Sequence, residues 1–350
     1  MTAVVLDGMG GDHAPSATAE GALLAARRGV EVVIVGDRAI LEAELDRLGP
    51  RHALVRVVHA ADAISMGEHS VREAVSRRES SIYVGMETLK RGEAAAFVSL
   101  GNTGAVLAVA FVVLGRLPGV ERPALGVLLP KPGAPLLFLD VGANAEARVS
   151  HLVQFARLGT AYMRFVQGVA EPRVGLLNIG EEASKGSPFT IEVNEALAQA
   201  KGVHFAGNVE GRDIVTGVVD VVVTDGFTGN VALKLLEGSV SMIFSEISSA
   251  VRRSPLALLG ALLMRPQIKR LQRRFDYRRF GGVPLLGVNG IVFVGHGRSD
   301  AQAVEGALVS AAAAAEAGML NELRRAIERE PMAGVESSAK EAAQPSAGDT

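Results

Sequence analysis

The first short polar motif lies at residues 7–13, which read Asp-Gly-Met-Gly-Gly-Asp-His directly after an apolar run. Glycines at such a position let the backbone approach a ligand closely. The polar side chains of this loop are Asp12 and His13, and a histidine here serves as a hydrogen-bond donor, an acid or a base. The alternative is a tight turn in which Asp12 caps a helix that begins near Pro15. His13 stands where a dinucleotide fingerprint needs its third glycine, so the motif does not indicate that fold signature.

A second motif opens a predicted helix after a predicted strand and reads Gly101, Asn102, Thr103, Gly104. Free backbone N–H groups at the start of a helix bind anions, and the helix dipole favours negative charge there. Asn102 and Thr103 add side-chain donors, so a phosphate or a developing oxyanion fits this position. An ordinary N-cap by Asn or Thr is the alternative interpretation.

A third motif, residues 178–187, carries Lys185 between Ser184 and Gly186 in a predicted loop. A lysine on a flexible stem supplies a mobile positive charge for a phosphate group. The alternative is that Lys185 is an ordinary solvated lysine of a loop.

Four further predicted strands end in polar, glycine-rich segments, at 140–144, 207–213, 225–230 and 295–300. Together these exits predict a polar cleft at one edge of a sheet.

Other kinds of chemistry are excluded by what the sequence lacks. The chain has no cysteine, which excludes disulfides, thiolate metal sites and a cysteine nucleophile. No Gly-x-Ser-x-Gly, no His-Glu-x-x-His and no histidine pair at metal-ligand spacing occurs. We therefore expect neither a metal site nor a cofactor.

An unusual segment runs from Arg252 to Arg279 and combines nine basic residues with one acid, Asp276. Its uncharged stretch, 255–264, is too short to span a bilayer but long enough to dip into one. The apolar residues predicted to contact a membrane are Leu256, Leu258, Leu259, Leu262, Leu263 and Met264. The basic residues predicted to meet an acidic partner or anionic lipid are Arg252, Arg253, Arg265, Lys269, Arg270 and Arg273. The alternative is a helix hairpin buried at a dimer interface.

The elements that must position these motifs follow from composition and periodicity. The chain has 350 residues, a net charge of -2 and 48% hydrophobic residues, enough for a large core. Aromatic residues make up 4% and tryptophan is absent, which argues against a base-stacking surface, so no nucleic-acid partner is expected. No signal peptide or membrane span is recognised, which favours a cytoplasmic enzyme.

Short apolar, β-branched runs alternate with longer amphipathic segments along the chain. Predicted strands lie at 4–7, 32–35, 54–59, 95–100, 126–129, 136–140, 174–179, 203–206, 219–224 and 291–294. Predicted helices lie at 15–28, 38–48, 70–91, 103–115, 150–168, 189–201, 228–252, 265–276 and 300–329. This alternation predicts an α/β fold with a doubly wound, mostly parallel sheet and helices on both faces. Residues 1–330 form one predicted catalytic unit with a hairpin at 228–280, and 331–350 a disordered tail.

The complete set of motifs resembles the bacterial acyl-acyl-carrier-protein:phosphate acyltransferases, the PlsX type, from about residue 3 to residue 325. The resemblance rests on the motifs at 6–15, 99–105, 139–144, 180–186, 207–211, 225–231 and 290–297. Gly8 and Leu100 stand where the family pattern has alanine. Both substitutions are small or apolar and leave the assignment intact.

The resemblance implies a fold similar to phosphotransacetylases and isopropylmalate dehydrogenases, usually as a homodimer. It also implies transfer of a fatty acyl group from acyl carrier protein to inorganic phosphate. The acyl phosphate product would feed a membrane glycerol-3-phosphate acyltransferase that makes lysophosphatidic acid. The family associates peripherally with membranes through a helix hairpin, which corresponds to 228–280 here. The basic residues of the hairpin would then meet the acidic carrier protein or lipid headgroups.

Roles for individual residues follow as hypotheses. Phosphate is assigned to Gly101, Asn102, Thr103, Gly104 and Lys185. Donors to the carbonyl oxygen or the leaving sulfur are His13, Asn208 and Asn230, while Asp12 and Asp225 orient these groups. Three other functions stay open: an acyl-CoA-dependent phosphotransacetylase, a nicotinamide-linked dehydrogenase and a non-enzymatic membrane scaffold.

Overall fold

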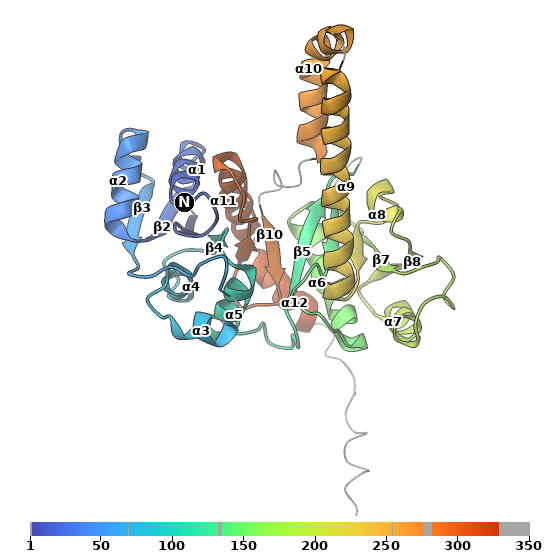
Figure 1. Ribbon diagram of the computed structural model, residues 1–350. Helices are drawn as coiled ribbons and strands as arrows, with labels where there is room; N and C mark the ends of the chain where they lie inside the picture. The colour runs from blue at the N-terminus through green and yellow to red at the C-terminus, as the bar shows by residue number, and fades with distance from the viewer. Residues whose placement is uncertain (1, 69, 132–134, 254, 276–281, 329–350) are drawn as a thin grey trace, which may run out of the picture.

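The computed structural model describes residues 2–68, 70–131, 135–253, 255–275 and 282–328. The side chains of 255, 256 and 269–275 and the predicted tail at 331–350 lie outside the described residues. One 11-stranded sheet runs through the described chain in the order β3-β2-β1-β4-β11-β10-β5-β6-β9-β7-β8. Helices pack on both of its faces (Figure 1). The predicted α/β fold is therefore confirmed.

The strands are short and almost entirely buried. They are β1 (Ala3–Asp7), β2 (Glu31–Gly36), β3 (Val55–His59), β4 (Ala96–Ser99), β5 (Ala124–Leu129), β6 (Leu136–Leu139), β7 (Arg173–Leu177), β8 (His204–Val209), β9 (Val221–Val223), β10 (Val283–Leu286) and β11 (Val292–Val294). Strand β10 was not predicted, and β8 extends beyond the predicted 203–206. Its length places Asn208 inside the strand instead of in a loop after it.

The sheet contains two parallel blocks that run in opposite directions. Pairings among β3, β2, β1, β4 and β11 are parallel, and so are those among β6, β9, β7 and β8. Between the blocks, β11 pairs antiparallel with β10, β10 with β5 and β5 with β6. Three reversals leave the second block antiparallel to the first. The strands of the two blocks therefore end in opposite directions, and the prediction of one common edge is wrong. Even so, segments that follow β4, β11, β6 and β9, from both blocks, border the same cavity.

The helices of the main body are α1 (Ser16–Arg27), α2 (Arg38–Leu48), α3 (Val71–Ser76), α4 (Ser81–Lys90), α5 (Thr103–Val113), α6 (Val149–Phe165), α7 (Pro188–Gln199), α8 (Asp213–Thr216), α11 (Ala301–Glu316) and α12 (Met319–Glu328). The predicted helix 70–91 is two helices, because the Ser80 side chain caps α4 at the Tyr83 N–H. The predicted helix 300–329 breaks at Gly318, whose positive φ ends α11.

The core has one layer on each face of the sheet, as the alternation of strand side chains requires. In β1, Val4 and Leu6 face the layer under α1, α6 and α11, while Val5 faces the layer under α4 and α5. All three side chains are fully buried. This packing rigidly positions the loops that leave the strands.

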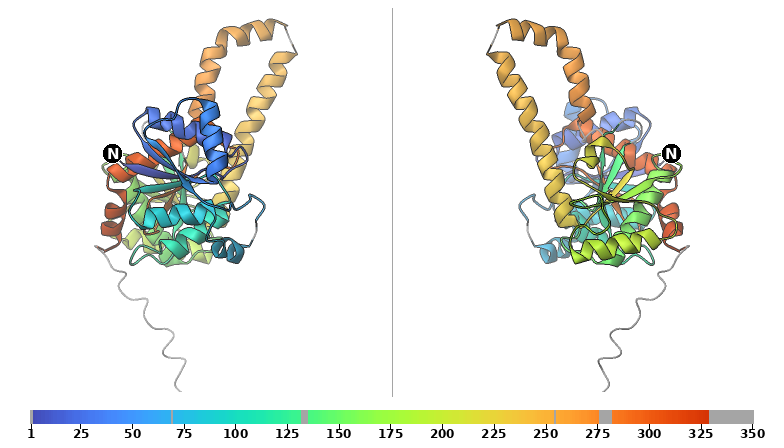
Figure 2. Two further views of the ribbon diagram at one scale, coloured as in Figure 1. Left: turned by 90° about the vertical axis from the view of Figure 1, so that its left-hand side faces the viewer. Right: turned by 90° about the vertical axis from the view of Figure 1, so that its right-hand side faces the viewer.

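Two long helices project from this body. Helix α9 (Gly226–Arg252) leaves the sheet and α10 (Pro255–Phe275) returns towards it, and both extend beyond the other elements (Figures 1 and 2). Helix α10 bends along its length (Figure 2). Pro266 lies inside it and removes a backbone hydrogen bond, which accounts for the bend. The predicted helix 265–276 thus begins ten residues earlier and includes the uncharged stretch.

The part of α10 farthest from the body exposes more than half of each of five apolar side chains. They are Leu258, Leu259, Leu262, Leu263 and Met264. The side chains of Leu256, Lys269, Arg270 and Arg273 lie outside the described residues, whereas Arg252, Arg253 and Arg265 are exposed. Within the described ranges no single helix is both long and apolar enough to cross a membrane, and α11 with α12 passes that test only as a pair bent by 56°.

Candidate active site

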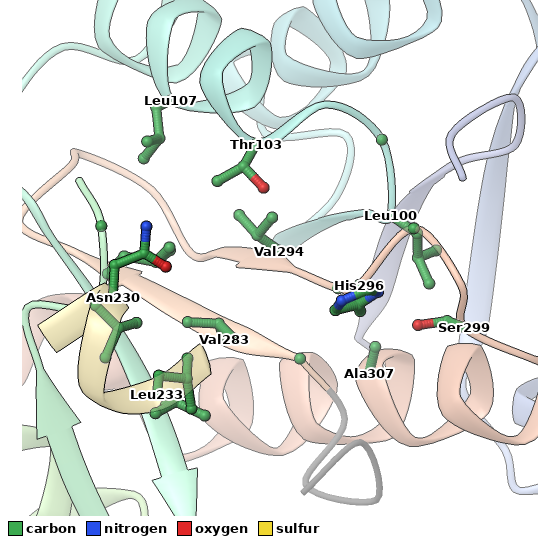
Figure 3. Close-up of a pocket in the computed structure, with 18 of the residues that line it drawn as sticks. Leu100, Thr103, Leu107, Asn230, Leu233, Val283, Val294, His296, Ser299 and Ala307 are labelled. Carbon is green, nitrogen blue, oxygen red and sulfur yellow. The ribbon is translucent and has the colours of Figure 1, made fainter. Parts of the chain in front are cut away.

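A cavity of about 420 Å³ lies across the strands at which the sheet reverses direction. We call it the central cavity (Figure 3). It is bordered by the starts of α5 and α9, by strands β11, β10 and β5, and by the loop after β11. Its polar and charged lining side chains are Thr103, Asn230, Lys234, Glu237, His296 and Ser299. Its apolar lining includes Leu100, Leu107, Leu125, Val127, Leu233 and Val294.

The α5 wall of the cavity is an uncharged hydrogen-bonding surface. Gly101, Thr103 and Gly104 line the cavity at the point where α5 begins. The Asn102 side chain caps the helix by accepting the Ala105 N–H at 3.0 Å. Its amide donates to the carbonyl oxygens of Met66 and Glu68, so both polar atoms of the Asn102 side chain are occupied, and Asn102 is not among the lining residues. The first N–H groups of an α-helix have no carbonyl acceptor within the helix, and they point out of its N-terminal end.

A buried aspartate at the end of β1 supports this wall. Asp7 accepts the Ser99 hydroxyl proton at 2.7 Å, and Ser99 Oγ accepts the Gly101 N–H at 3.0 Å. Burial raises the pKa of Asp7, although hydrogen bonds from Ser81, Ser99 and the backbone of Met9 oppose that rise. A Cβ at Gly10 would overlap the Asp7 carboxylate, so only glycine fits there.

The α9 wall carries the charged groups. Asn230, Leu233, Lys234 and Glu237 line the cavity at helical spacing on one face of α9. Asp225 caps this helix by accepting the Thr228 N–H at 2.9 Å and the Thr228 hydroxyl at 2.7 Å. Among the described lining residues, Lys234 is the one lysine, and none is an arginine. Sequence reasoning missed Lys234, and its position four residues after Asn230 on a predicted helix is the signal that would have found it.

A second buried aspartate supports the α9 wall. Asp140 accepts backbone N–H groups from Leu125, Gly142, Ala143 and Asn144, and also the Asn144 side-chain amide, all between 2.8 and 3.1 Å. Burial raises the pKa of Asp140, against the opposing effect of these donors. The start of α9 packs directly on this residue, because a Cβ at Gly229 would overlap the Asp140 carbonyl oxygen.

His296 occupies the rim of the cavity on the loop after β11. Its Nδ1 accepts the Arg298 backbone N–H at 3.2 Å. A neutral imidazole held in this way carries its proton on Nε2, which is therefore the donor. Figure 3 places His296 beside Ser299 and opposite Asn230. The motif 295–300 was recognised in the sequence, but no role was assigned to His296.

The remaining residues singled out in the sequence lie away from the lining. The Asp12 N–H donates to the Gly297 carbonyl at 2.7 Å, so Asp12 lies behind the rim, and His13 next to it is exposed. Lys185 is exposed on a loop of the second block. Asn208 is buried in β8, where its amide donates to the Glu182 carbonyl at 2.8 Å and its Oδ1 accepts from Asn194 at 2.8 Å. Both of its polar atoms are therefore occupied in holding that loop.

The comparisons with known proteins agree with one another. A family model described as "Fatty acid synthesis protein" matches residues 2–322. A phosphate acyltransferase of Thermus thermophilus is 51% identical over 322 residues, which is 92% of this chain and 97% of that protein. A phosphate acyltransferase of Clostridium perfringens is 39% identical over 87% of this chain and 91% of its own length.

Solved structures are similar in fold at low sequence identity. A phosphotransacetylase from Streptococcus pyogenes has a TM-score of 0.62 and 17% identity, covering 90% of this chain and 94% of that one. A putative 4-hydroxythreonine-4-phosphate dehydrogenase from Salmonella typhimurium has a TM-score of 0.55 and 15% identity, covering 89% and 99%. At such identities the likeness establishes the fold alone. The family match and the close relatives go further: this chain belongs to the fatty acid synthesis protein family, together with the bacterial phosphate acyltransferases, and is an acyltransferase.

Proposed function

We propose that this enzyme transfers a fatty acyl group from acyl carrier protein to inorganic phosphate, and that the acyl phosphate serves phospholipid synthesis through lysophosphatidic acid. One observation carries the proposal. The start of helix α5, a lysine and an apolar surface line the same cavity. The family to which the chain belongs supports the same chemistry.

Phosphate binds between the two walls of the central cavity in this proposal. The backbone N–H groups of Thr103 and Gly104 and the Thr103 hydroxyl donate to its oxygens. Lys234 supplies a positive charge from the α9 wall. A phosphate dianion held by backbone donors and one ammonium group is positioned to attack the thioester. Because only one cation contacts it, its oxygens keep most of their negative charge and remain nucleophilic.

The reaction requires no covalent enzyme intermediate. A phosphate oxygen attacks the thioester carbonyl carbon, a C–O bond forms, and the carbonyl oxygen takes up the negative charge. The amide of Asn230 and Nε2–H of His296 are the proposed donors to that oxyanion or to the leaving sulfur. The C–S bond then breaks and the thiolate leaves with the electron pair. Asp12 and Asp225 are positioning residues, because they hold the loop behind the rim and the start of α9.

The acyl chain lies against the apolar lining. Leu107, Leu125 and Val127 come from α5 and β5 and border the same cavity as the polar groups. Burial of each methylene contributes about 0.8 kcal/mol, so a long chain binds more tightly than an acetyl group. This supports a fatty acyl substrate.

We further propose that the enzyme is a cytoplasmic homodimer bound peripherally to anionic membranes, close to the membrane acyltransferase that uses its product. The exposed apolar far end of α10 would enter the lipid surface and Arg252, Arg253 and Arg265 would meet headgroups. A triple variant, Leu258→Glu, Leu259→Glu and Leu262→Glu, is expected to lose flotation with anionic liposomes. Val71→Glu, at an equally exposed residue of α3, is the control and should still float. Unchanged flotation of the triple variant would disprove the lipid contact.

The central experiment incubates the purified protein with palmitoyl-acyl carrier protein, with and without inorganic phosphate. We expect release of free carrier only with phosphate, and a hydroxamate after trapping with hydroxylamine. A parallel reaction with palmitoyl-CoA tests the phosphotransacetylase alternative. If the enzyme uses palmitoyl-CoA and does not use palmitoyl-acyl carrier protein, the acyl donor is the CoA ester and not the carrier protein. No phosphate-dependent release from either thioester by the folded protein would refute the proposal.

A further inference from the structure

A second cavity, of about 330 Å³, lies where α5 ends and α6 begins. We call it the arginine cavity. Its lining residues are Phe111, Arg116, Glu121, Arg122, Arg148 and His151. Neither the sequence motifs nor the proposed reaction accounts for this concentration of guanidinium groups at one place.

The arginine cavity has an excess of positive charge. Glu121 is its one carboxylate, and that group is within 3.2 Å of His151 Nε2 and accepts the Ser150 hydroxyl at 3.1 Å. Burial lowers the pKa of His151, and the charges of Arg122 and Arg148 lower it further against the opposing effect of the Glu121 carboxylate, so His151 adds little positive charge. Three arginines therefore face one carboxylate. Across the described chain, neither Arg122 nor Arg148 forms an ion pair, and both side chains are exposed.

An apolar patch adjoins these charges. Phe111 and Val112 at the end of α5 are 44% and 53% exposed. The Arg116 guanidinium lies 5.7 Å from the centre of the Phe111 ring and donates to the Glu121 carbonyl at 2.7 Å, so it is held in place. Exposed aromatic and arginine side chains are the types enriched at the centres of protein interfaces. The positive rim selects a partner with an acidic surface.

The arginine cavity and the central cavity share the same elements. Thr103, Leu107 and Phe111 are four residues apart and lie on one face of α5; the first two line the central cavity and the third lines the arginine cavity. The span from Thr103 to Phe111 is about 12 Å along the helix axis. The β5 region also contributes to both, with Arg122 in one and Leu125 in the other. A flexible arm anchored at the arginine cavity would therefore have a short path to the reacting groups.

We infer that the arginine cavity and the adjoining Phe111–Val112 surface are the docking site for the acidic acyl carrier protein, which delivers its thioester along α5 into the central cavity. The inference rests on the proposed function. It assigns carrier recognition to this face of the body and leaves the basic residues of α9 and α10 for lipid.

The test uses the double variant Arg122→Glu/Arg148→Glu, because neither side chain has an ion pair to lose. We expect at least a tenfold increase in KM for acyl carrier protein and in the Kd for fluorescently labelled holo-carrier, with little change in kcat. Turnover of octanoyl-N-acetylcysteamine, a thioester without a protein, should be unchanged. Arg27→Glu/Arg56→Glu makes the same change of charge at exposed residues outside both cavities and should behave as wild type.

The outcomes separate this inference from the proposed function. If wild-type protein turns over no thioester with phosphate, the proposed function fails. If it uses the carrier but the Arg122→Glu/Arg148→Glu variant has unchanged KM and Kd, the docking site is wrong. Loss of carrier binding only in Arg252→Glu/Arg253→Glu would move docking to α9 and α10. A change in the sedimentation of the Arg122→Glu/Arg148→Glu variant would assign this face to a second copy of the chain instead.

Discussion

The α5 wall and the α9 wall of the central cavity both rest on a buried aspartate, but the two carboxylates are held differently. Asp7 reaches the start of α5 through one intermediary, the Ser99 hydroxyl. Asp140 receives five direct N–H bonds, and the start of α9 packs on its backbone. A relay through a hydroxyl can reorient, whereas five converging donors fix a loop in one arrangement.

This difference corresponds to what each wall must do. The α5 wall presents backbone donors whose geometry the helix itself determines. The α9 wall presents side chains, Asn230 and Lys234, on a helix that extends far beyond the body. Small tilts of such a helix would displace both groups, so its start needs the firmer anchor.

Gly229→Ala should break the α9 wall most completely. The added Cβ meets the Asp140 carbonyl oxygen, which is backbone and cannot move aside. We expect a loss of about 3 kcal/mol in the free energy of unfolding and loss of acyl phosphate formation. Gly238→Ala is the matched control, since it lies on the same helix with open space around it, and should stabilise by up to about 1 kcal/mol. Equal unfolding midpoints for the two variants in urea would contradict the packing argument.

Asp140→Asn and Asp7→Asn compare the two anchors directly. In Asp140→Asn the remaining oxygen can accept the three N–H groups now bound to Oδ1, but the NH2 group faces the two Asn144 donors now bound to Oδ2 and leaves them unsatisfied, each at about 1–3 kcal/mol. At Asp7 the Ser99 hydroxyl can rotate to accept, so we expect a loss of only about 1 kcal/mol there. Urea unfolding measures both. A greater loss at Asp7 would reverse the comparison.

Lys234→Ala sharpens the assignment of charge to the α9 wall. Removal of the lining lysine should raise KM for phosphate about tenfold, equivalent to about 1.4 kcal/mol, with the KM for the acyl donor little changed. Lys185→Ala removes the same charge from an exposed loop away from the lining and should change KM for phosphate less than twofold. A larger effect from Lys185 than from Lys234 would return phosphate binding to the loop at 178–187.

The smallest expected effect is on pH dependence. The folded-state pKa of Asp7 is raised by burial, so the folded protein holds this proton more strongly than the unfolded chain. Asp7 therefore contributes to the free energy of unfolding below about pH 4, which is its pKa in the unfolded chain. This contribution is lost as the pH rises through the higher pKa of the folded state. Wild-type stability relative to Asp7→Asn should therefore decline between pH 4 and 7. A relative stability that rises over this interval would show that hydrogen bonding outweighs burial.

Much of the site could be predicted because strand ends, helix caps and helix starts depend on a few consecutive residues. The pattern 101–104 indicates a helix start after a strand, and α5 begins at Thr103 with Asn102 as its cap. Asp225 and Asn230 lie in a motif of the same kind, at the start of α9. Residues brought in from elsewhere were harder to find. Lys234 has no signature beyond its helical spacing. The predicted strand 203–206 ends too early, so the sequence places Asn208 in a loop, whereas β8 continues to Val209.

By itself the sequence determined most of the strands and helices, the polar character of the strand exits, the absence of thiol chemistry and the family. Only the tertiary structure decided which exits meet. Apolar periodicity reveals a strand but carries no sign of its direction or neighbour. The unpredicted β10 and its antiparallel pairings reverse the sheet between the two blocks. That reversal turns the strands of the two blocks in opposite directions, and the starts of α5 and α9, one from each block, form two walls of one cavity.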